Sequence, residues 1–299
     1  MTGFRAIILG AAAGGGLPQW NCGCPNCEAA RQGRIPRATQ SSLAVTADGR
    51  DWAILNASPD IGEQLVATPV LHPTGPRVSP LKAVLLTNGD LDHVAGLLTL
   101  REKQPFDLVA TGDILGVIAA NPVFGALDPA CVTRRAVALE APFELLPGLT
   151  ATLFAVPGKV PLYMEKGEVV TDREGEQTVG VELRTGRHRA LYIPGCARVT
   201  ERLKARIDGA DVLFLDGTLW RDDEMIRAGL GTKTGARMGH VSISGPEGSI
   251  AACRDLDIGR KVFVHMNNSN PVHDPRSPER AEAEAAGWTV GQDGMEIAP

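Results

Sequence analysis

The feature that most constrains the fold is the recurrence of short, apolar, β-type runs along the whole chain. They include AIIL near the start, then AVLLT and DLVAT, and later VGVEL, DVLFLDG and KVFVHM. Helical patterns separate many of them, at residues 61–68, 93–103, 199–207 and 248–256. Such alternation predicts a layered α/β protein. We expect one domain over residues 1–299, made of two related halves that the polar stretch 169–177 connects.

The composition excludes several classes of function. The chain has 30 Lys and Arg against 35 Asp and Glu, a net charge of −5, and its basic residues are dispersed. We therefore expect neither nucleic-acid binding nor attraction to an anionic membrane surface. No apolar segment reaches the roughly 18–20 residues that span a bilayer, so we expect no membrane insertion. The expected partners are small molecules or peptides.

The N-terminal stretch FRAIILGAAAGGG is interpreted as a buried strand at residues 6–9 that runs into a glycine-rich loop, rather than as a secretory signal. The glycines would let the backbone of this loop approach a metal region closely. Three of the six cysteines fall within NCGCPNC. Because such clustering suits a metal better than a disulfide framework, we expect a cytoplasmic protein.

Histidine, carboxylate and amide side chains gather where the predicted strands end, as binding residues do in many α/β proteins. They are Asn88, Asp90, Asp92 and His93 in the loop LLTNGDLDHVAG, Asp216 after VLFL, His240 in RMGHVSI and His265 after VFV. Each one alone has an ordinary structural explanation, since an Asp after a strand often caps a helix and a single His is often a satisfied, partly buried side chain. Together they predict a metal site.

The cysteines Cys22, Cys24 and Cys27 form the second candidate site. Three thiolates at this spacing can surround one Zn²⁺, and a fourth ligand would close a tetrahedral structural site. Asn268 and His273, both downstream of His265, are the candidates for the fourth position, and histidine is chemically the better zinc ligand. The alternative is a thiol cluster without a metal.

The loop TNGDLDHVAG resembles the metallo-β-lactamase superfamily motif, in which His-x-His-x-Asp-His follows a strand. The resemblance implies a four-layer αββα sandwich with its metals between the two sheets. Asn88 and Asp90 stand in place of the two leading histidines, whereas Asp92 and His93 retain the closing pair. Where the family has its middle histidine, in a turn after a strand, this chain has Lys159.

The same resemblance places Asp216 at the bridging carboxylate and His265 at the last histidine of the family. Asp92, His93 and His265 would then hold one catalytic metal, with Asp216 or Asp90 able to add an oxygen. Two histidines and one carboxylate are typical of non-haem Fe(II) oxygenases. Hydrolysis by paired metals requires both metal positions to be filled.

A closer resemblance covers essentially the whole chain. The segments GGLPQWNCGCPNC, LNASPDIGEQL, TNGDLDHVAGLL, MGHVSISG, HMNNSNP with SPER after it, and the C-terminal DGMEI are similar to those of the PqqB family of coenzyme PQQ biosynthesis proteins. The resemblance implies a structural zinc at the N-terminal cysteines. It also implies Fe(II)- and O₂-dependent hydroxylation of the tyrosine ring in a small precursor derived from Glu and Tyr.

Three functions follow from these residues. The first is such an oxygenase, with His240 as the acid/base group, Asp90 beside the metal and Lys159 attracting a substrate carboxylate. The second is a metal-dependent hydrolase of the ordinary superfamily kind, which Asn88, Asp90 and Lys159 disfavour. The third is a non-catalytic carrier of PQQ. A structural hydrogen bond is the other interpretation of His240, and a homodimer is among the assemblies that the sequence leaves open.

Overall fold

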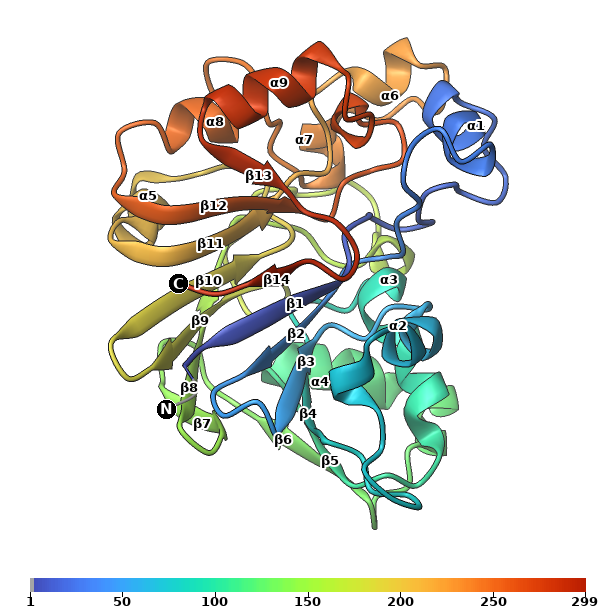
Figure 1. The fold of residues 1–299 in the computed structure, drawn as a ribbon, viewed down its shortest axis with the longest axis vertical. Helices are drawn as coiled ribbons and strands as arrows, with labels where there is room; N and C mark the ends of the chain where they lie inside the picture. The colour runs from blue at the N-terminus through green and yellow to red at the C-terminus, as the bar shows by residue number, and fades with distance from the viewer. Residues whose placement is uncertain (1–2) are drawn as a thin grey trace.

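The computed structural model describes residues 3–299 and has two seven-stranded sheets that face each other (Figure 1). The first sheet has the order β14-β1-β2-β3-β4-β5-β6. Its strands are β1 (Arg5–Gly10), β2 (Ser42–Thr46), β3 (Trp52–Leu55), β4 (Leu81–Leu85), β5 (Phe106–Ala110), β6 (Val132–Ala136) and β14 (Glu296–Ile297). Strands β1 to β3 pair antiparallel, whereas β3 to β6 pair parallel. The parallel strands β3 and β4 are almost wholly buried, as apolar runs covered on both faces should be.

The second sheet repeats this plan with the order β13-β12-β11-β10-β9-β8-β7. Its strands are β7 (Phe143–Leu146), β8 (Leu149–Ala155), β9 (Val179–Thr185), β10 (His188–Ile193), β11 (Ala210–Asp216), β12 (Ile258–Val264) and β13 (Trp288–Val290). Strands β7 to β10 pair antiparallel and β10 to β13 pair parallel. In each half of the chain, the first strands thus pair antiparallel and the later strands pair parallel.

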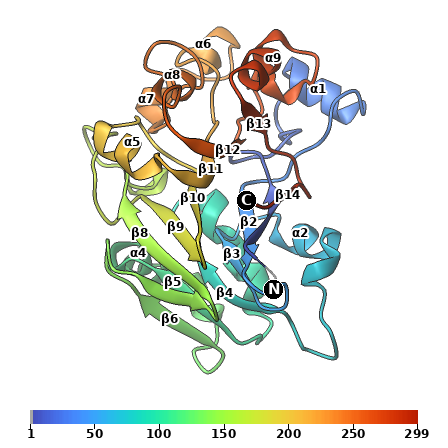
Figure 2. The same cartoon turned by 60° about the vertical axis from the view of Figure 1, so that its left-hand side comes forward.

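Helices lie outside the pair of sheets, and several of them pack against the outer faces. They are α1 (Pro25–Arg31), α2 (Ile61–Ala67), α3 (Leu91–Val94), α4 (Gly112–Ala120), α5 (Glu201–Ile207), α6 (Glu224–Arg227), α7 (Gly235–Met238), α8 (Ser249–Ala252) and α9 (Pro278–Ala285). Helices α2 and α4 contact strands β1 and β6 of the first sheet, and α9 contacts β13 of the second. In both views α7, α8 and α9 lie at the top, near β12 and β13, and α2 lies beside the first sheet (Figure 2). The layers are therefore αββα, as the superfamily resemblance implied.

The space between the sheets is filled by one continuous hydrophobic core. Strands β3 and β4 of the first sheet contact β7 of the second. The largest fully buried side chains include Trp52 in one sheet and Phe214 in the other. Because the core is continuous, the two sheets hold each other in place, and with them the loops at their strand ends.

Three expectations about the chain's organisation were wrong in detail. Residues 169–177 do not connect the halves, because they lie between β8 and β9 of the second sheet, and the link between the sheets is residues 137–142. The helix expected at 93–103 is the short α3 followed by the 3-10 helix Ala95–Arg101. The helix expected at 248–256 is only α8. Among residues 3–299, no helix is both long enough and apolar enough to cross a membrane.

Candidate metal centres

Two triads of metal-ligating side chains meet at the ends of parallel strands. Asp92 and His93 lie in α3, just after the loop that follows β4, and His265 directly follows β12. The ligand atoms of these three residues lie within 4.8 Å of one another. A second triad, formed by Asp216 at the end of β11, His240 and the same His265, meets the same criterion. The strand ends thus bring together five side chains that the sequence singled out.

His93 is oriented by Asn88 so that one ring nitrogen stays free. Its Nδ1 atom lies 2.7 Å from Oδ1 of Asn88, an acceptor, so Nδ1 carries the proton. Nε2 is buried and has no hydrogen-bond partner within the described residues. Burial lowers the pKa of His93 to about 4, so the ring is neutral at neutral pH. A neutral imidazole with a free, buried Nε2 is the form that ligates a metal.

Asp92 and His265 face each other across the centre. Nε2 of His265 lies 3.0 Å from Oδ2 of Asp92, and its Nδ1 lies 2.9 Å from the hydroxyl of Thr218. If the Thr218 hydroxyl accepts a proton from Nδ1 of His265, Nε2 of a neutral ring carries a lone pair that faces the carboxylate oxygen of Asp92. Two such electron-rich atoms repel each other. A proton or a metal ion between them makes the contact favourable. Although burial opposes the shift, the hydrogen bond and charge of Asp92 raise the pKa of His265. This donor set fits a divalent metal.

The glycine-rich loop lies against this centre, as its composition predicted. A Cβ atom added at Gly14 would come within 3.4 Å of Oδ2 of Asp92. Backbone hydrogen bonds join Met266, the residue after His265, to Ala11 and Ala13 of the same loop at 2.9 and 2.8 Å. His265 itself has a φ of 59°, in the left-handed region that non-glycine residues rarely adopt.

Thr218 joins the second triad together, and sequence reasoning missed it. Its hydroxyl lies 2.6 Å from Oδ1 of Asp216 and 3.0 Å from Nδ1 of His240, besides its contact with His265. Nδ1 of His240 is 2.7 Å from Oδ2 of Asp216. Although burial would raise the pKa of Asp216, the charge and hydrogen bond of His240 lower it. The only signal in the sequence was the place of Thr218 two residues after a strand-end aspartate.

Asp90 and Lys159 lie at the edge of the centre and have other partners. Oδ1 of Asp90 accepts a hydrogen bond of 3.2 Å from the backbone N–H of Leu162. Burial, together with the charge of Asp92, raises the pKa of Asp90. Nζ of Lys159 forms an ion pair of 3.1 Å with Glu165, which also binds Arg237. Lys159, expected to attract a substrate carboxylate, is therefore already paired with Glu165, but Glu165 is shared by two cations, and this group of three side chains keeps a net positive charge.

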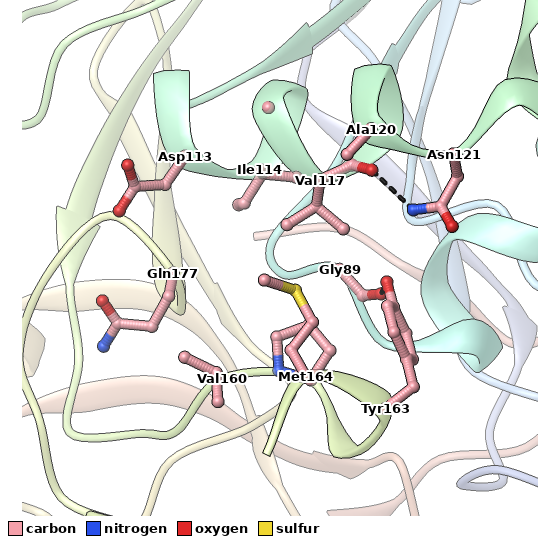
Figure 3. Close-up of a pocket in the computed structure, with 12 residues that line it drawn as sticks. Gly89, Asp113, Ile114, Val117, Ala120, Asn121, Val160, Tyr163, Met164 and Gln177 are labelled. Atoms are coloured by element: carbon pink, nitrogen blue, oxygen red, sulfur yellow. Dashed lines mark hydrogen bonds between the residues drawn. The ribbon is translucent and has the colours of Figure 1, made fainter. Parts of the chain in front are cut away.

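Two hollows lie near the candidate centre, and the first of them is lined by one of its residues. A cleft of about 840 Å³ is lined by His240 together with Trp220, Arg198 and Arg221. A cavity of about 430 Å³ lies beside Gly89 and is lined mainly by apolar side chains of α4 and of residues 160–164 (Figure 3). The hydroxyl of Tyr163 donates a hydrogen bond of 2.7 Å to the carbonyl of Gly89, and both residues line this cavity. His240 is thus reachable from an open cleft.

The cysteine cluster is the other candidate metal centre. The Sγ atoms of Cys22, Cys24 and Cys27 lie within 4.8 Å of one another, and none forms a disulfide. The side-chain amide of Asn268 faces all three, with Nδ2 at 3.2, 3.5 and 3.3 Å from their sulfurs. Because the two ends of an amide have nearly the same shape, a half-turn would present Oδ1 to a metal instead. Three thiols and one amide oxygen fit a tetrahedral zinc.

His273 does not join the cysteines. Its Nε2 faces the backbone carbonyl of Met266 at 3.3 Å, and burial lowers its pKa to about 4. Of the two residues that the sequence left open for the fourth position, the structure brings only Asn268 to the thiols. The backbone of the loop after β12 explains this, because Asn270 caps the short 3-10 helix Pro271–His273 and so turns His273 away.

Comparisons with known proteins agree with this architecture. The family model of the beta-lactamase superfamily domain matches residues 51–266. Coenzyme PQQ synthesis protein B of Methylobacterium sp. (strain 4-46) is 58% identical over 297 residues, covering 98% of this chain and 99% of the relative. The protein of the same name from Ruegeria pomeroyi is also 58% identical, over 294 residues, with the same two coverages.

Solved structures give the same result. The crystal structure of Zn²⁺-bound PqqB from Methylobacterium extorquens is 56% identical, with a TM-score of 0.97, over 99% of this chain and 100% of that one. A diphosphatase of the PhnP family has a TM-score of 0.70 over 99% of this chain and 98% of its own, but at 20% identity it shares the fold alone. The chain therefore belongs to the PqqB family of coenzyme PQQ synthesis proteins, within the beta-lactamase superfamily.

Proposed function

We propose that this protein acts in coenzyme PQQ synthesis by hydroxylating the tyrosine ring of a small precursor derived from Glu and Tyr, with Fe(II) and O₂. The names of its relatives support the pathway. The observation that carries the chemistry is the triad of Asp92, His93 and His265, whose ligand atoms lie within 4.8 Å of one another. Two histidines and one carboxylate leave the other side of a bound metal open.

The donor set suits Fe(II). His93 is neutral, its Nε2 has a free lone pair, and Asn88 prevents the ring from turning. Asp92 supplies one negative charge and His265 the second imidazole. Bound Fe(II) would supply the one-electron chemistry that lets O₂ react with a closed-shell aromatic ring. The protein's part is to hold these three ligands in place and to leave access for the ring.

The reaction must balance in atoms and electrons. For each hydroxyl group added, one oxygen atom of O₂ enters a ring C–H bond and the other leaves as water. This step consumes two electrons and two protons, so a two-electron reductant of the ascorbate class is required as co-reactant. The product is a ring with one additional hydroxyl group.

His240 is the residue that we assign to proton transfer. Its Nδ1 faces Asp216 at 2.7 Å, which leaves Nε2 to exchange a proton with a substrate hydroxyl. The ring also lines the cleft of about 840 Å³, from which substrate would enter. Because His240 also lies within ligand distance of Asp216 and His265, a direct metal contact is the competing role for the same side chain.

Lys159 is proposed to attract a carboxylate of the substrate. Its ammonium already contacts Glu165 at 3.1 Å, and Glu165 also pairs with Arg237 at 3.0 Å. A substrate carboxylate would therefore share the two cations with Glu165 or take its place. This requirement favours a precursor with several carboxylates over a neutral one.

A metal-dependent hydrolase is the second candidate, and one observation favours it. The triad of Asp216, His240 and His265 offers a second set of ligands that shares His265 with the first. Paired metals could occupy such a site and activate water. Turnover of a phosphodiester by the Zn²⁺-loaded protein would support this candidate. Against it, Asn88, Asp90 and Lys159 stand where ordinary members of the superfamily have metal ligands.

The test of the proposal is a reaction started with oxygen. Protein loaded anaerobically with Fe(II) is mixed with a Glu–Tyr dipeptide and ascorbate, exposed to O₂ and analysed by mass spectrometry. We expect an iron-dependent product with added oxygen that disappears in His93→Ala. The matched control is His72→Ala, because His72 is exposed and its side chain has one hydrogen bond among the described residues, with the carbonyl of Val66. No oxygenated product, with either the dipeptide or a cyclised intermediate, would overturn the proposal and favour a carrier of PQQ.

A further inference from the structure

The two candidate metal centres share one short loop. His265 belongs to the catalytic triad, and Asn268, three residues later, faces the three cysteine sulfurs. Three residues of extended chain span at most roughly 11 Å, so the two centres are near neighbours. A movement of this loop at one centre cannot leave the other centre unchanged.

The backbone at the catalytic end of the loop needs support. His265 has a φ of 59°, a conformation that costs free energy for a residue with a Cβ atom and persists only where its surroundings enforce it. Thr218 provides part of that support, since its hydroxyl lies 3.0 Å from the carbonyl of His265 and its own carbonyl accepts the N–H of Asn267 at 2.9 Å. The glycine-rich loop provides another part through Met266.

The rest of the support comes from the cysteine segment. Asn26 lies within CPNC, between Cys24 and Cys27, and its side-chain amide donates two hydrogen bonds to the loop. They reach the backbone carbonyls of Asn268 at 3.0 Å and Asn270 at 2.9 Å. Asn26 is not a metal ligand, so these bonds link the two segments without belonging to either centre.

A second connection runs through the N-terminal chain itself. The segment that ends at Cys27 begins at the glycine-rich loop, where Ala11 and Ala13 pair with Met266 and Gly14 lies against Asp92. The N-terminal segment 11–27 and the loop 265–270 therefore each contact both centres. A metal ion that fixes the three thiols would fix the ends of both segments at once.

We infer that the cysteine centre and the Asp92–His93–His265 centre are energetically coupled through Asn26 and the loop 265–270, so that zinc at the cysteines raises the affinity of the catalytic centre for its metal. Zinc holds the cysteine segment rigid, the segment holds the loop, and the loop keeps His265 in its left-handed conformation with Nε2 toward Asp92. The coupling is reciprocal, because each metal must raise the affinity for the other by the same factor. It rests on the two metal centres proposed above, but it does not depend on the hydroxylation reaction.

The coupling sets no order of loading by itself, because each metal raises the affinity for the other by the same factor. It predicts that loss of zinc through oxidation of the thiols weakens binding of the catalytic metal as well, although none of the three cysteines belongs to that centre.

The test is a titration with Co(II), whose visible absorption distinguishes histidine and carboxylate ligands from thiolates. Full-length protein that carries zinc at the cysteines only is titrated without substrate or O₂, as wild type and as Asn26→Ala. We expect the variant to keep one zinc per chain and to bind Co(II) at the catalytic centre about tenfold more weakly or worse. The matched control is Asn21→Ala, because Asn21 is an exposed asparagine of the cysteine segment whose side chain has one hydrogen bond among the described residues, from Gln19, and this variant should bind Co(II) as wild type does. Wild-type Co(II) affinity in Asn26→Ala would overturn the inference.

A second measurement applies if Asn26→Ala does not fold or loses its zinc. The equilibrium affinity of the wild-type cysteine centre for zinc is measured by competition with a chromophoric chelator, with the catalytic centre empty and with it filled by Co(II). Reciprocity predicts a higher zinc affinity when Co(II) is bound. Equal affinities would contradict the coupling, whatever the enzyme does with O₂.

Discussion

Asn88 accepts the Nδ1 proton of His93 across 2.7 Å and thereby leaves Nε2 of His93 buried and free. In the superfamily motif that the sequence resembles, a histidine ligand stands where this chain has Asn88. The replacement removes one candidate ligand and adds a residue that orients a neighbouring candidate ligand, His93. Such partners of ligating histidines fix the tautomer and the ring orientation, and therefore the metal affinity.

Removal of the Asn88 acceptor should weaken the catalytic metal site. We expect Asn88→Ala to lower the metal affinity by about 10- to 100-fold, because the His93 ring loses its partner and its preferred tautomer. Asn88→Asp keeps an acceptor at the same place and should retain more of the affinity. Isothermal titration with Fe(II) or Co(II) measures both variants. Equal affinities in wild type and Asn88→Ala would show that Asn88 does not orient the ligand.

Cys24→Ser should remove the structural zinc and destabilise the fold. With zinc at a hundred times its Kd, binding contributes about 2.7 kcal/mol to stability, and this contribution would be lost. Metal analysis and thermal unfolding measure the effect. Cys131→Ser is the control, because Cys131 lies outside the cluster and should keep the zinc. A full zinc content in Cys24→Ser would show that Cys24 is not a zinc ligand.

The fourth zinc ligand can be tested by two alanine variants. Asn268 faces the three sulfurs, whereas His273 faces the carbonyl of Met266. Asn268→Ala should therefore lower zinc affinity, and His273→Ala should leave it near the wild-type value. Competition with a chromophoric zinc chelator compares the two. The opposite order would assign the fourth position to His273 and require the loop to rearrange on binding.

The ion pairs of Glu165 should make stability depend on pH in a defined direction. The hydrogen bond from Arg237, aided by Lys159, lowers the pKa of Glu165 from 4.5 to about 2. A carboxylate with a lowered folded-state pKa stabilises the protein above its unfolded pKa, and this contribution disappears as the pH falls toward about 2. Glu165→Gln should therefore cost about 1 kcal/mol at pH 7, and the difference should shrink below roughly pH 4.5.

Urea unfolding at several pH values measures this difference. Glu168→Gln is the matched control, because Glu168 is exposed and forms no ion pair within residues 3–299. It should have nearly the stability of wild type throughout. A Glu165→Gln cost that stays constant down to pH 3 would mean that the side chain acts through packing and not through its charge.

Local patterns predicted most of the framework. The apolar runs DVLFLDG and KVFVHM became β11 and β12, and VTERLKARI became α5, because burial and helical periodicity are encoded within a few residues. The strand-end residues Asp92, His93, Asp216 and His265 came together, since parallel strands end at one edge of their sheets. Of the two residues left open for the fourth position beside the cysteines, only Asn268 came to the three sulfurs.

Pairwise contacts across the fold were not predictable in this way. Residues 169–177 resembled a linker because they are polar, yet polarity does not say which strands a loop joins. Nothing near Lys159 in the sequence indicates that Glu165 pairs with it or that Arg237 shares this carboxylate. Thr218 and Asn26 are common loop residues, and their roles appear only where the loops after β11 and β12 meet the N-terminal segment.

The measurement that tests the central claim most directly is the origin of the oxygen in the product. Fe(II)-loaded protein, a Glu–Tyr dipeptide and ascorbate are allowed to react under oxygen-18 gas in ordinary water, and in parallel under ordinary O₂ in oxygen-18 water. If Asp92, His93 and His265 hold an iron centre that hydroxylates the ring, each new hydroxyl carries oxygen-18 in the first experiment and not in the second, and His93→Ala gives no product. Label that enters only from water would contradict the account and indicate a hydrolytic or hydration reaction.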